Sequence, residues 1–232
     1  MYFSRIKLSH TAKEDMEFWS RTKNQISLYI LFSKLFFGEN RSENRSENSF
    51  IFRQEFGSCY PSFFSVSEYL PEDDSGNWKI SSDEYNPLVK CGEEFNFSLR
   101  FCPLIMKRES GILLRYDCIS DALENMRKSI IPASEMTEKS EIIKMAALNW
   151  ILAKSDSNGF IPDKNKFIAD GFTEHKFEIS SGKTLFYNTI ETSGKLKVTD
   201  KEKFEKALFK GIGDYRDLGC GMILIKDFIY EK

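Results

Sequence analysis

Alternating and densely apolar segments predict the first elements of this chain. Met1–Leu8 alternates apolar and polar residues, which is the pattern of a half-buried strand. Asn24–Phe37 follows, after a polar stretch, as a helix that is apolar on most faces, and such a helix packs against a sheet. Ser49–Glu55 and Ser62–Val66 are two further predicted strands. The first part of the chain is therefore predicted as strand, helix, strand, strand.

A second unit is predicted to begin near Glu93. Phe95–Phe101 is its first strand, and Lys139–Lys154 is the clearest amphipathic helix of the chain. Most of the charged residues of this helix lie away from its apolar face. The apolar face consists of Ile142, Met145, Ala146, Trp150 and Ala153.

The last predicted helix and strands complete the element order of a known domain type. Strands are predicted at Phe177–Ile179 and Thr184–Ile190, on either side of a short turn. Asp200 is placed to cap a helix that runs to Phe209, and Gly221–Ile229 is the final strand. Strand, helix, two strands, helix and strand is the βαββαβ order of a ferredoxin-like domain.

The fold class is therefore predicted as α+β, with two tandem ferredoxin-like (RRM-like) βαββαβ domains. The first part of the chain is the weaker copy of this pattern. The predicted domains are residues 1–88 and residues 93–232. A doubled NRSE unit, Asn40–Asn48, is predicted as a solvent loop of the first domain.

Composition narrows the class of protein. The 232 residues are 41% hydrophobic, which indicates a folded protein. The net charge of −2 lowers the expectation of a nucleic-acid partner, although a local basic patch still acts within about 10 Å. Five scattered cysteines without a CxxC pair indicate reduced thiols in a cytoplasmic protein, with no metal site. The most apolar run, Ile26–Phe37, contains Lys34 and is too short to cross a membrane.

A glycine-rich segment, residues 211–221, has the sequence GIGDYRDLGCG. Glycines at these positions permit tight turns and bring backbone amides close to another surface, such as a phosphate chain. The alternative is an ordinary turn between a helix and a strand, without a ligand. The segment matches neither the GxGxxG nor the Walker pattern. Its glycines are Gly211, Gly213, Gly219 and Gly221.

The position of this segment, between the last helix and the last strand, resembles the glycine-rich loop of CRISPR repeat-processing endonucleases. Other segments resemble the CasE family in the same order along nearly the whole chain. They are MYFSRIKL, SFIFRQE, FNFSLRFCP, the helix around Ala147–Trp150, and GKLKVTD. The chain is thus similar to the CasE family of CRISPR repeat-RNA endoribonucleases.

The resemblance implies a substrate, a reaction and partners. Proteins of the CasE family bind the hairpin of CRISPR repeat RNA and cut the precursor without a metal or cofactor. The 2′-hydroxyl attacks its own phosphate and leaves a 2′,3′-cyclic phosphate and a 5′-hydroxyl. The protein then stays with its product as a subunit of the type I-E Cascade complex. The implied partners are therefore CRISPR repeat RNA and other Cascade subunits, with no membrane.

The resemblance also places the family's key histidine at Tyr29, and a tyrosine of some relatives at Ile26. A phenol titrates at about 10 and an imidazole at about 6.5, so Tyr29 is a poor base at neutral pH. Tyr29 can still donate a proton or a hydrogen bond, or it can simply pack. His10, after the first strand, is the second catalytic candidate. His175 lies in a charged segment and is predicted at the surface.

The candidate RNA-binding residues are basic side chains near the glycine-rich segment and near the predicted turn at residues 180–182. For each cation the alternative is a solvated charge, and the one at the helix end can instead complement the helix dipole. The candidates are Arg216, Lys210, Lys183 and Lys176, together with the four glycines.

Three interpretations stay open from the sequence. The first is an active endoribonuclease that uses an unusual set of residues. The second is a Cascade subunit that holds the RNA hairpin and cuts it very slowly or not at all. The third is a ferredoxin-like interaction protein that does not bind RNA.

Overall fold

The computed structural model describes residues 1–21, 25–37, 49–55, 60–128, 138–178, 184–226 and 228. Two compact units are present. The first unit consists of residues 1–88, 209–211 and 215–222, and the second of residues 89–208, 212–214 and 223–232. The glycine-rich segment is therefore shared between them, whereas the sequence assigned all of it to the second domain. The limits 1–88 and 93–232 stay a prediction about independently folding domains.

The first unit is built on a four-stranded antiparallel sheet in the order β2-β3-β1-β4. This order places the first strand between the third and the fourth, as a ferredoxin-like domain does. The strands are β1 (Tyr2–Leu8), β2 (Phe50–Glu55), β3 (Ser62–Ser67) and β4 (Trp78–Glu84). The helices are α1 (His10–Glu14), α2 (Met16–Arg21) and α3 (Gln25–Phe37).

The predicted strands and helix of the first unit are confirmed, and three elements were missed. The segment between β1 and α3 is polar in sequence but forms α1 and α2, and Ser9 caps α1 by accepting a hydrogen bond from the amide of Ala12. β4 contains only two large apolar residues, Trp78 and Ile80, so its sequence gives a weak strand signal. Its backbone pairs with β1 along seven residues, and this pairing determines its conformation.

Aromatic side chains fill the core between α3 and the first sheet. Phe32 is fully buried, with its ring 4.9 Å from that of Phe52 and 4.8 Å from that of Phe63. Phe36 stacks on Phe50 with ring centroids 4.1 Å apart. Because aromatic rings bury large areas, this cluster is the main stabilising contact that holds α3 in place.

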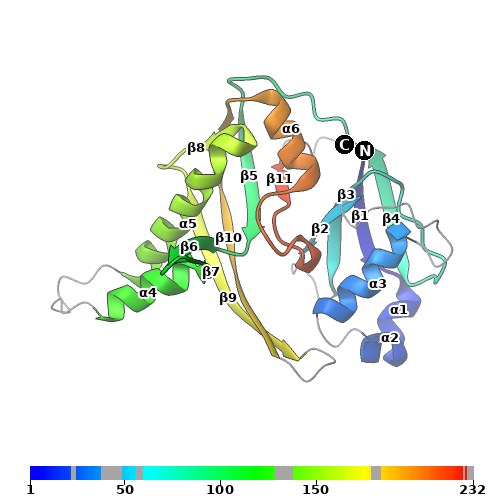
Figure 1. Cartoon of the computed structure of the whole chain (residues 1–232). Helices are drawn as coiled ribbons and strands as arrows, with labels where there is room; N and C mark the ends of the chain where they lie inside the picture. The colour runs from blue at the N-terminus through cyan, green and yellow to red at the C-terminus, as the bar shows by residue number, and fades with distance from the viewer. Residues whose placement is uncertain are drawn as a thin grey trace. The chain divides into compact units, whose positions relative to one another are not determined.

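The second unit has a sheet in the order β11-β5-β10-β8, and β9 also pairs with β10. β8 and β9 share β10 as a partner, so together they occupy the position of a single ferredoxin strand. Figure 1 shows β9 and β10 extending well beyond the end of β5. The strands are β5 (Glu94–Phe101), β6 (Leu104–Glu109), β7 (Ile112–Asp117), β8 (Phe160–Pro162), β9 (Ile168–Glu178), β10 (Thr184–Val198) and β11 (Ile223–Ile225).

Two long helices, α5 and α6, were predicted and are confirmed. Asp200 caps α6 as expected, since its carboxylate accepts a hydrogen bond from the amide of Lys203 at 3.1 Å. The β6–β7 hairpin and α4 were missed, and β9 and β10 are much longer than predicted. The helices are α4 (Cys118–Lys128), α5 (Lys139–Ser155) and α6 (Lys201–Lys210), with short 3-10 helices η2 (Asp156–Asn158) and η3 (Arg216–Leu218).

Candidate functional site

The glycine-rich segment follows α6 and has a left-handed backbone at each of its four glycines. The φ angles lie between 71° and 86° at Gly211, Gly213, Gly219 and Gly221. Side chains are strained in this region, and glycine is not. The segment therefore requires its glycines for its own conformation, whether or not a ligand approaches.

Gly211 and Gly219 also lie against β2. A Cβ atom at Gly211 would come within 2.0 Å of Ile51 Cδ1 and 2.9 Å of the Gly221 carbonyl oxygen. A Cβ atom at Gly219 would lie 3.4 Å from the ring of Phe52, which is ordinary contact. Gly211 is thus required by both conformation and space, and Gly219 by conformation alone.

Arg216 closes the glycine-rich segment onto the end of α6. Its Nη1 donates a hydrogen bond of 2.9 Å to the carbonyl oxygen of Lys210, one of the last carbonyls of the helix. Both side chains are exposed. The structure thus holds the Arg216 side chain against the backbone of Lys210, the residue that carries a second predicted cation. The acidic neighbours Asp214 and Asp217 reduce the local positive charge.

Tyr29 lies on α3, half-buried above β2. Its ring stacks on Phe52 with centroids 5.9 Å apart and on Phe50 at 6.2 Å. η3, inside the glycine-rich segment, packs against both α3 and β2. Phe52 therefore contacts Tyr29 and also lies close to Gly219. The structure brings Tyr29 and the glycine-rich segment together around one phenylalanine.

His10 lies in the first turn of α1 and points into solvent. Its side chain is 87% exposed, and its Nδ1 lies 3.8 Å from Glu14 Oε1. Among the described residues this is its one polar contact. In the described part of the chain no neighbouring group fixes the orientation of this ring, and the ring is not in contact with Tyr29 or the glycine-rich segment.

Lys176 lies near the end of β9 and is exposed. Its Nζ lies 5.7 Å from the ring centroid of Phe186, directly across the strand pair, and Phe186 is 65% exposed. An exposed aromatic ring with a cation beside it is a surface on which a nucleic-acid base can stack. Sequence reasoning missed Phe186, because one phenylalanine among 21 carries no distinct signal. Lys183 lies outside the described residues.

His175, one residue before Lys176, is half-buried, contrary to the prediction of a surface position. It pairs with Tyr187 across the two strands, and the rings stack with centroids 4.5 Å apart and planes at 13°. Its Nε2 lies 2.8 Å from Thr189 Oγ1, a hydrogen bond. The ring is therefore held by two neighbours on β10. Only the strand pairing reveals these contacts.

Burial lowers the pKa of His175, and the positive charge of Arg100 lowers it further. Arg100 forms an ion pair with Glu191, its partner in the register between β5 and β10. A lowered pKa keeps the imidazole neutral at pH 7. A neutral imidazole can accept a proton.

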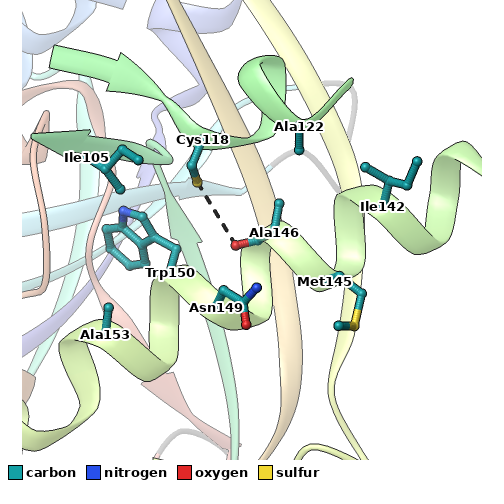
Figure 2. A pocket seen from close by; sticks show the side chains of 9 residues that line it. All are labelled: Ile105, Cys118, Ala122, Ile142, Met145, Ala146, Asn149, Trp150 and Ala153. Carbon is teal, nitrogen blue, oxygen red and sulfur yellow. Dashed lines mark hydrogen bonds between the residues drawn. The ribbon is translucent and has the colours of Figure 1, made fainter. Parts of the chain in front are cut away.

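The second unit also contains an apolar pocket of ≈ 500 Å³ between α4, α5 and β6. Figure 2 shows the predicted apolar face of α5 lining it, including Met145 and Trp150, with Cys118 on the opposite wall. Burial raises the pKa of the Cys118 thiol to about 12, so it is not a nucleophile at neutral pH. This pocket offers packing surface and no reactive group. Within the described ranges, no helix is long and apolar enough to span a membrane.

The sequence matches a known family along almost its whole length. Residues 1–227 match the family described as "CRISPR associated protein". No curated protein matches the chain at a significant level. The family resemblance predicted from the ordered segments and the glycine-rich segment is confirmed.

Several solved structures share the fold of the whole chain. A CRISPR endoribonuclease Cse3 bound to a 19-nucleotide RNA has a TM-score of 0.70 and 17% identity, with 97% of this chain and 99% of that chain covered. Thermus thermophilus Cse3, bound to an RNA that represents a pre-cleavage complex, has a TM-score of 0.66 and 16% identity, with 97% and 98% covered. A chain of a CRISPR RNA-guided surveillance complex has a TM-score of 0.59 and 13% identity, with 97% and 98% covered. These similarities establish the predicted tandem ferredoxin-like fold.

Proposed function

Because this chain belongs to the CRISPR associated protein family, we propose that it binds the hairpin of CRISPR repeat RNA and processes the precursor RNA. The family match over residues 1–227 is the observation that carries the proposal. The RNA-bound structures that share its fold support it. The same match speaks against an interaction protein unrelated to CRISPR RNA.

The proposed reaction is metal-independent attack of a 2′-hydroxyl on the adjacent phosphate, which gives a 2′,3′-cyclic phosphate and a 5′-hydroxyl. It requires that the phosphate be held in line and that its extra negative charge be stabilised. We assign the first task to the glycine-rich segment, whose backbone approaches closely, and the second to Arg216. Within the described residues Arg216 donates one hydrogen bond, to the Lys210 carbonyl oxygen, so four of its five guanidinium N–H groups remain for a phosphate.

Tyr29 is proposed to contact the reacting phosphate next to this segment. Its phenol donates a hydrogen bond to a phosphate oxygen or a proton to the departing oxygen, and it does not serve as the base. The packing around Phe52 supports this role, because Phe52 holds the Tyr29 ring and α3, which carries Tyr29, packs against η3. His10 stays a second catalytic candidate, and Lys210, Lys176 and Lys183 stay proposed RNA contacts.

A partner complex follows from the same family membership. One protein with this fold is a chain of a CRISPR RNA-guided surveillance complex. We propose that the present chain likewise remains on the processed hairpin as a subunit of a Cascade complex. Several cations acting together would hold the RNA stem by its phosphates, because an A-form stem is recognised mostly by shape.

A second candidate function is a guide-RNA holder that does not cut, or cuts very slowly. The observation that favours it is Tyr29, at the position where the family resemblance places a histidine. A phenol is nearly fully protonated at neutral pH and cannot replace the imidazole as a base.

The test is to incubate the purified protein with its own repeat RNA in excess EDTA and to identify the ends of the products. Cutting at the base of the hairpin, with a 2′,3′-cyclic phosphate, is the expected result. Tight binding of the hairpin without a cut would establish the holder instead. Neither binding nor cutting would contradict both functions.

A further inference from the structure

We propose that the face of the first sheet turned away from α3 binds unpaired nucleotides of the repeat RNA that adjoin the hairpin. The inference deepens the proposed function and rests on it. This sheet has the four-stranded order β2-β3-β1-β4, and RNA-recognition motifs stack bases on aromatic side chains of such a sheet. A fold alone does not assign a site, so the proposal depends on the side chains that this face carries.

Strand alternation divides the side chains of this sheet between two faces. Ile6, Phe52 and Phe63 belong to the aromatic core beneath α3. Their neighbours along the strands point the other way and form what we call the outer face. Register sets the outer face in three rows across β2, β3, β1 and β4, which are Glu55, Ser62, Lys7 and Lys79, then Arg53, Phe64, Arg5 and Ser81, then Ile51, Val66, Phe3 and Asp83.

The outer face is positively charged in a chain of net charge −2. Its three rows contain four cations and two carboxylates. Each carboxylate already lies beside an arginine of the same face. Glu55 Oε1 is 2.6 Å from Arg53 Nε, and Asp83 Oδ2 is 3.7 Å from Arg5 Nη1. The positive charge that remains is that of the two lysines in the first row.

Lys7 and Lys79 lie directly opposite each other in the register between β1 and β4. The Cβ atoms of such a pair are about 5 Å apart, and like charges in this position destabilise a sheet. Both side chains are exposed, and neither forms an ion pair with any residue that the structure describes. A phosphate bound between the two ammonium groups would remove this repulsion, so the pair is suited to an anionic ligand.

Phe64 supplies an aromatic ring one row away from the lysines. It lies two residues beyond Ser62, the partner of Lys7, which is about 7 Å along the strand. Its ring stacks on that of Phe3, with centroids 5.6 Å apart and planes at 27°. Phe3 is only 7% exposed, whereas Phe64 is partly exposed. A ring that a buried neighbour supports and that reaches solvent is a platform for one base.

This combination fits an unpaired nucleotide rather than the stem. A base can stack on an aromatic ring only when its own face is uncovered, and the bases of an A-form stem already cover one another. The outer face also adjoins the glycine-rich segment within the first unit, because Gly211 lies against the side chain of Ile51 in the third row. The same unit thus offers a path from the segment proposed to hold the reacting phosphate to a surface for the adjoining nucleotides.

The experiment compares the repeat hairpin alone with the hairpin that carries its unpaired flanks. Both RNAs have a 2′-deoxy group at the cut site, so that filter binding measures affinity without cleavage. The wild-type protein should bind the flanked RNA about 10-fold more tightly. Lys7→Ser/Lys79→Ser should lose most of this gain and keep its affinity for the hairpin alone. Its salt slope on the flanked RNA should fall by about 1.4, since each contact to a single strand contributes about 0.7.

Lys164→Ser/Lys197→Ser is the matched control. It removes two exposed lysines from the second unit and should leave both affinities at the wild-type value. Urea denaturation shows whether each variant is folded. Replacement of Lys7 and Lys79 should not reduce stability, because it relieves the repulsion between two facing cations.

Phe64→Leu separates stacking from charge. Leucine keeps an apolar contact with Phe3 but has no aromatic face, so affinity for the flanked RNA should fall by about 10-fold with an unchanged salt slope. Flanks with abasic nucleotides should lower the wild-type affinity by the same factor and should be bound equally by Phe64→Leu. Should Phe64→Leu fail to fold, the abasic flanks still measure the stacking on the wild-type protein.

Each outcome decides between the inference and the function beneath it. Equal wild-type affinity for the two RNAs, or an undiminished gain in Lys7→Ser/Lys79→Ser, would overturn the inference while the proposed function stands. A loss of affinity in that variant that is the same with and without the flanks would place the lysines on the stem and overturn it as well. Abasic flanks bound as tightly as intact ones would refute the role of Phe64. Absence of hairpin binding by the wild-type protein would instead contradict the proposed function itself.

Discussion

Two of the regions proposed to contact RNA are built by different means. In the first unit, the glycine-rich segment lies beside Tyr29, and backbone conformation and buried rings determine its shape. In the second unit, β9 and β10 form a long pair whose side chains present the functional groups, with a regular ladder as support. The shape of the glycine-rich segment depends on residues that have no side chain, whereas the β9–β10 pair acts through the side chains that it carries.

This difference predicts opposite responses to substitution. A segment with left-handed glycines packed on β2 has no room for an added methyl group at Gly211. A surface strand pair tolerates changes of side chain, because its backbone hydrogen bonds do not depend on them. Substitutions at the glycines of the first region should therefore change stability together with binding, and those on the β9–β10 pair should act chiefly on binding or rate.

The largest effect is expected from Gly211→Ala. The new Cβ would overlap Ile51 and the Gly221 carbonyl and would occupy a φ of 71°, so the loss should be about 3 kcal/mol or more in the free energy of unfolding. Gly76→Ala is the matched control, since Gly76 has the same φ of 71° but nothing within 4 Å. It should lose about 1 kcal/mol. Urea denaturation measures both, and equal losses would show that crowding at Gly211 is unimportant.

Next in size is a gain of activity in Tyr29→His. An imidazole at this position supplies the base that the family resemblance expects, and cleavage in EDTA should rise by about 100-fold. Ile30→His is the control, because residue 30 is exposed and lies about 100° further around α3. Single-turnover cleavage of the repeat hairpin measures the change. No gain in Tyr29→His, or the same gain in Ile30→His, would contradict the placement of Tyr29 at the reacting phosphate.

A smaller effect is expected in RNA affinity from Arg216→Ala. Loss of one phosphate contact should weaken binding by about 10-fold and reduce the slope of log affinity against log salt by about 1. Arg216→Lys keeps the charge and should keep the salt slope. Filter binding at several salt concentrations gives both values. An unchanged slope in Arg216→Ala would mean that this guanidinium only closes the segment onto Lys210.

The smallest effect concerns the pH dependence of stability. The pKa of His175 is lowered in the folded state, so below about 6.5 the unfolded chain binds more protons than the folded one. Stability should therefore be full at higher pH and should fall as the pH drops through 6.5. His175→Gln should make this part of the curve flatter in denaturant titrations at pH 5 to 8. A steeper curve in His175→Gln would reverse the assigned direction of the shift.

Much of the fold was accessible from the sequence because it depends on local patterns. The alternation in Met1–Leu8, the apolar run that forms α3, and the Asp200 cap of α6 are short-range signals, and each is confirmed. The glycine-rich segment was recognised by its spacing together with its position between the last helix and the last strand. The elements that were missed have weak local signals. β4 and residues 168–176 of β9 exist because a neighbouring strand pairs with their backbones.

The candidate site likewise has residues that the sequence identified and contacts that only the tertiary structure showed. The sequence alone identified the glycines, Tyr29 and the cations, since these follow from residue type and from position relative to a family pattern. Only the tertiary structure placed Phe52 close to both Tyr29 and Gly219, and only strand register set His175 against Tyr187 and Thr189. Contacts between distant residues depend on register and packing, and a shift of one residue would turn His175 to the other face of its strand. A histidine predicted at the surface from the sequence is thus half-buried in the fold and held by two neighbours on β10.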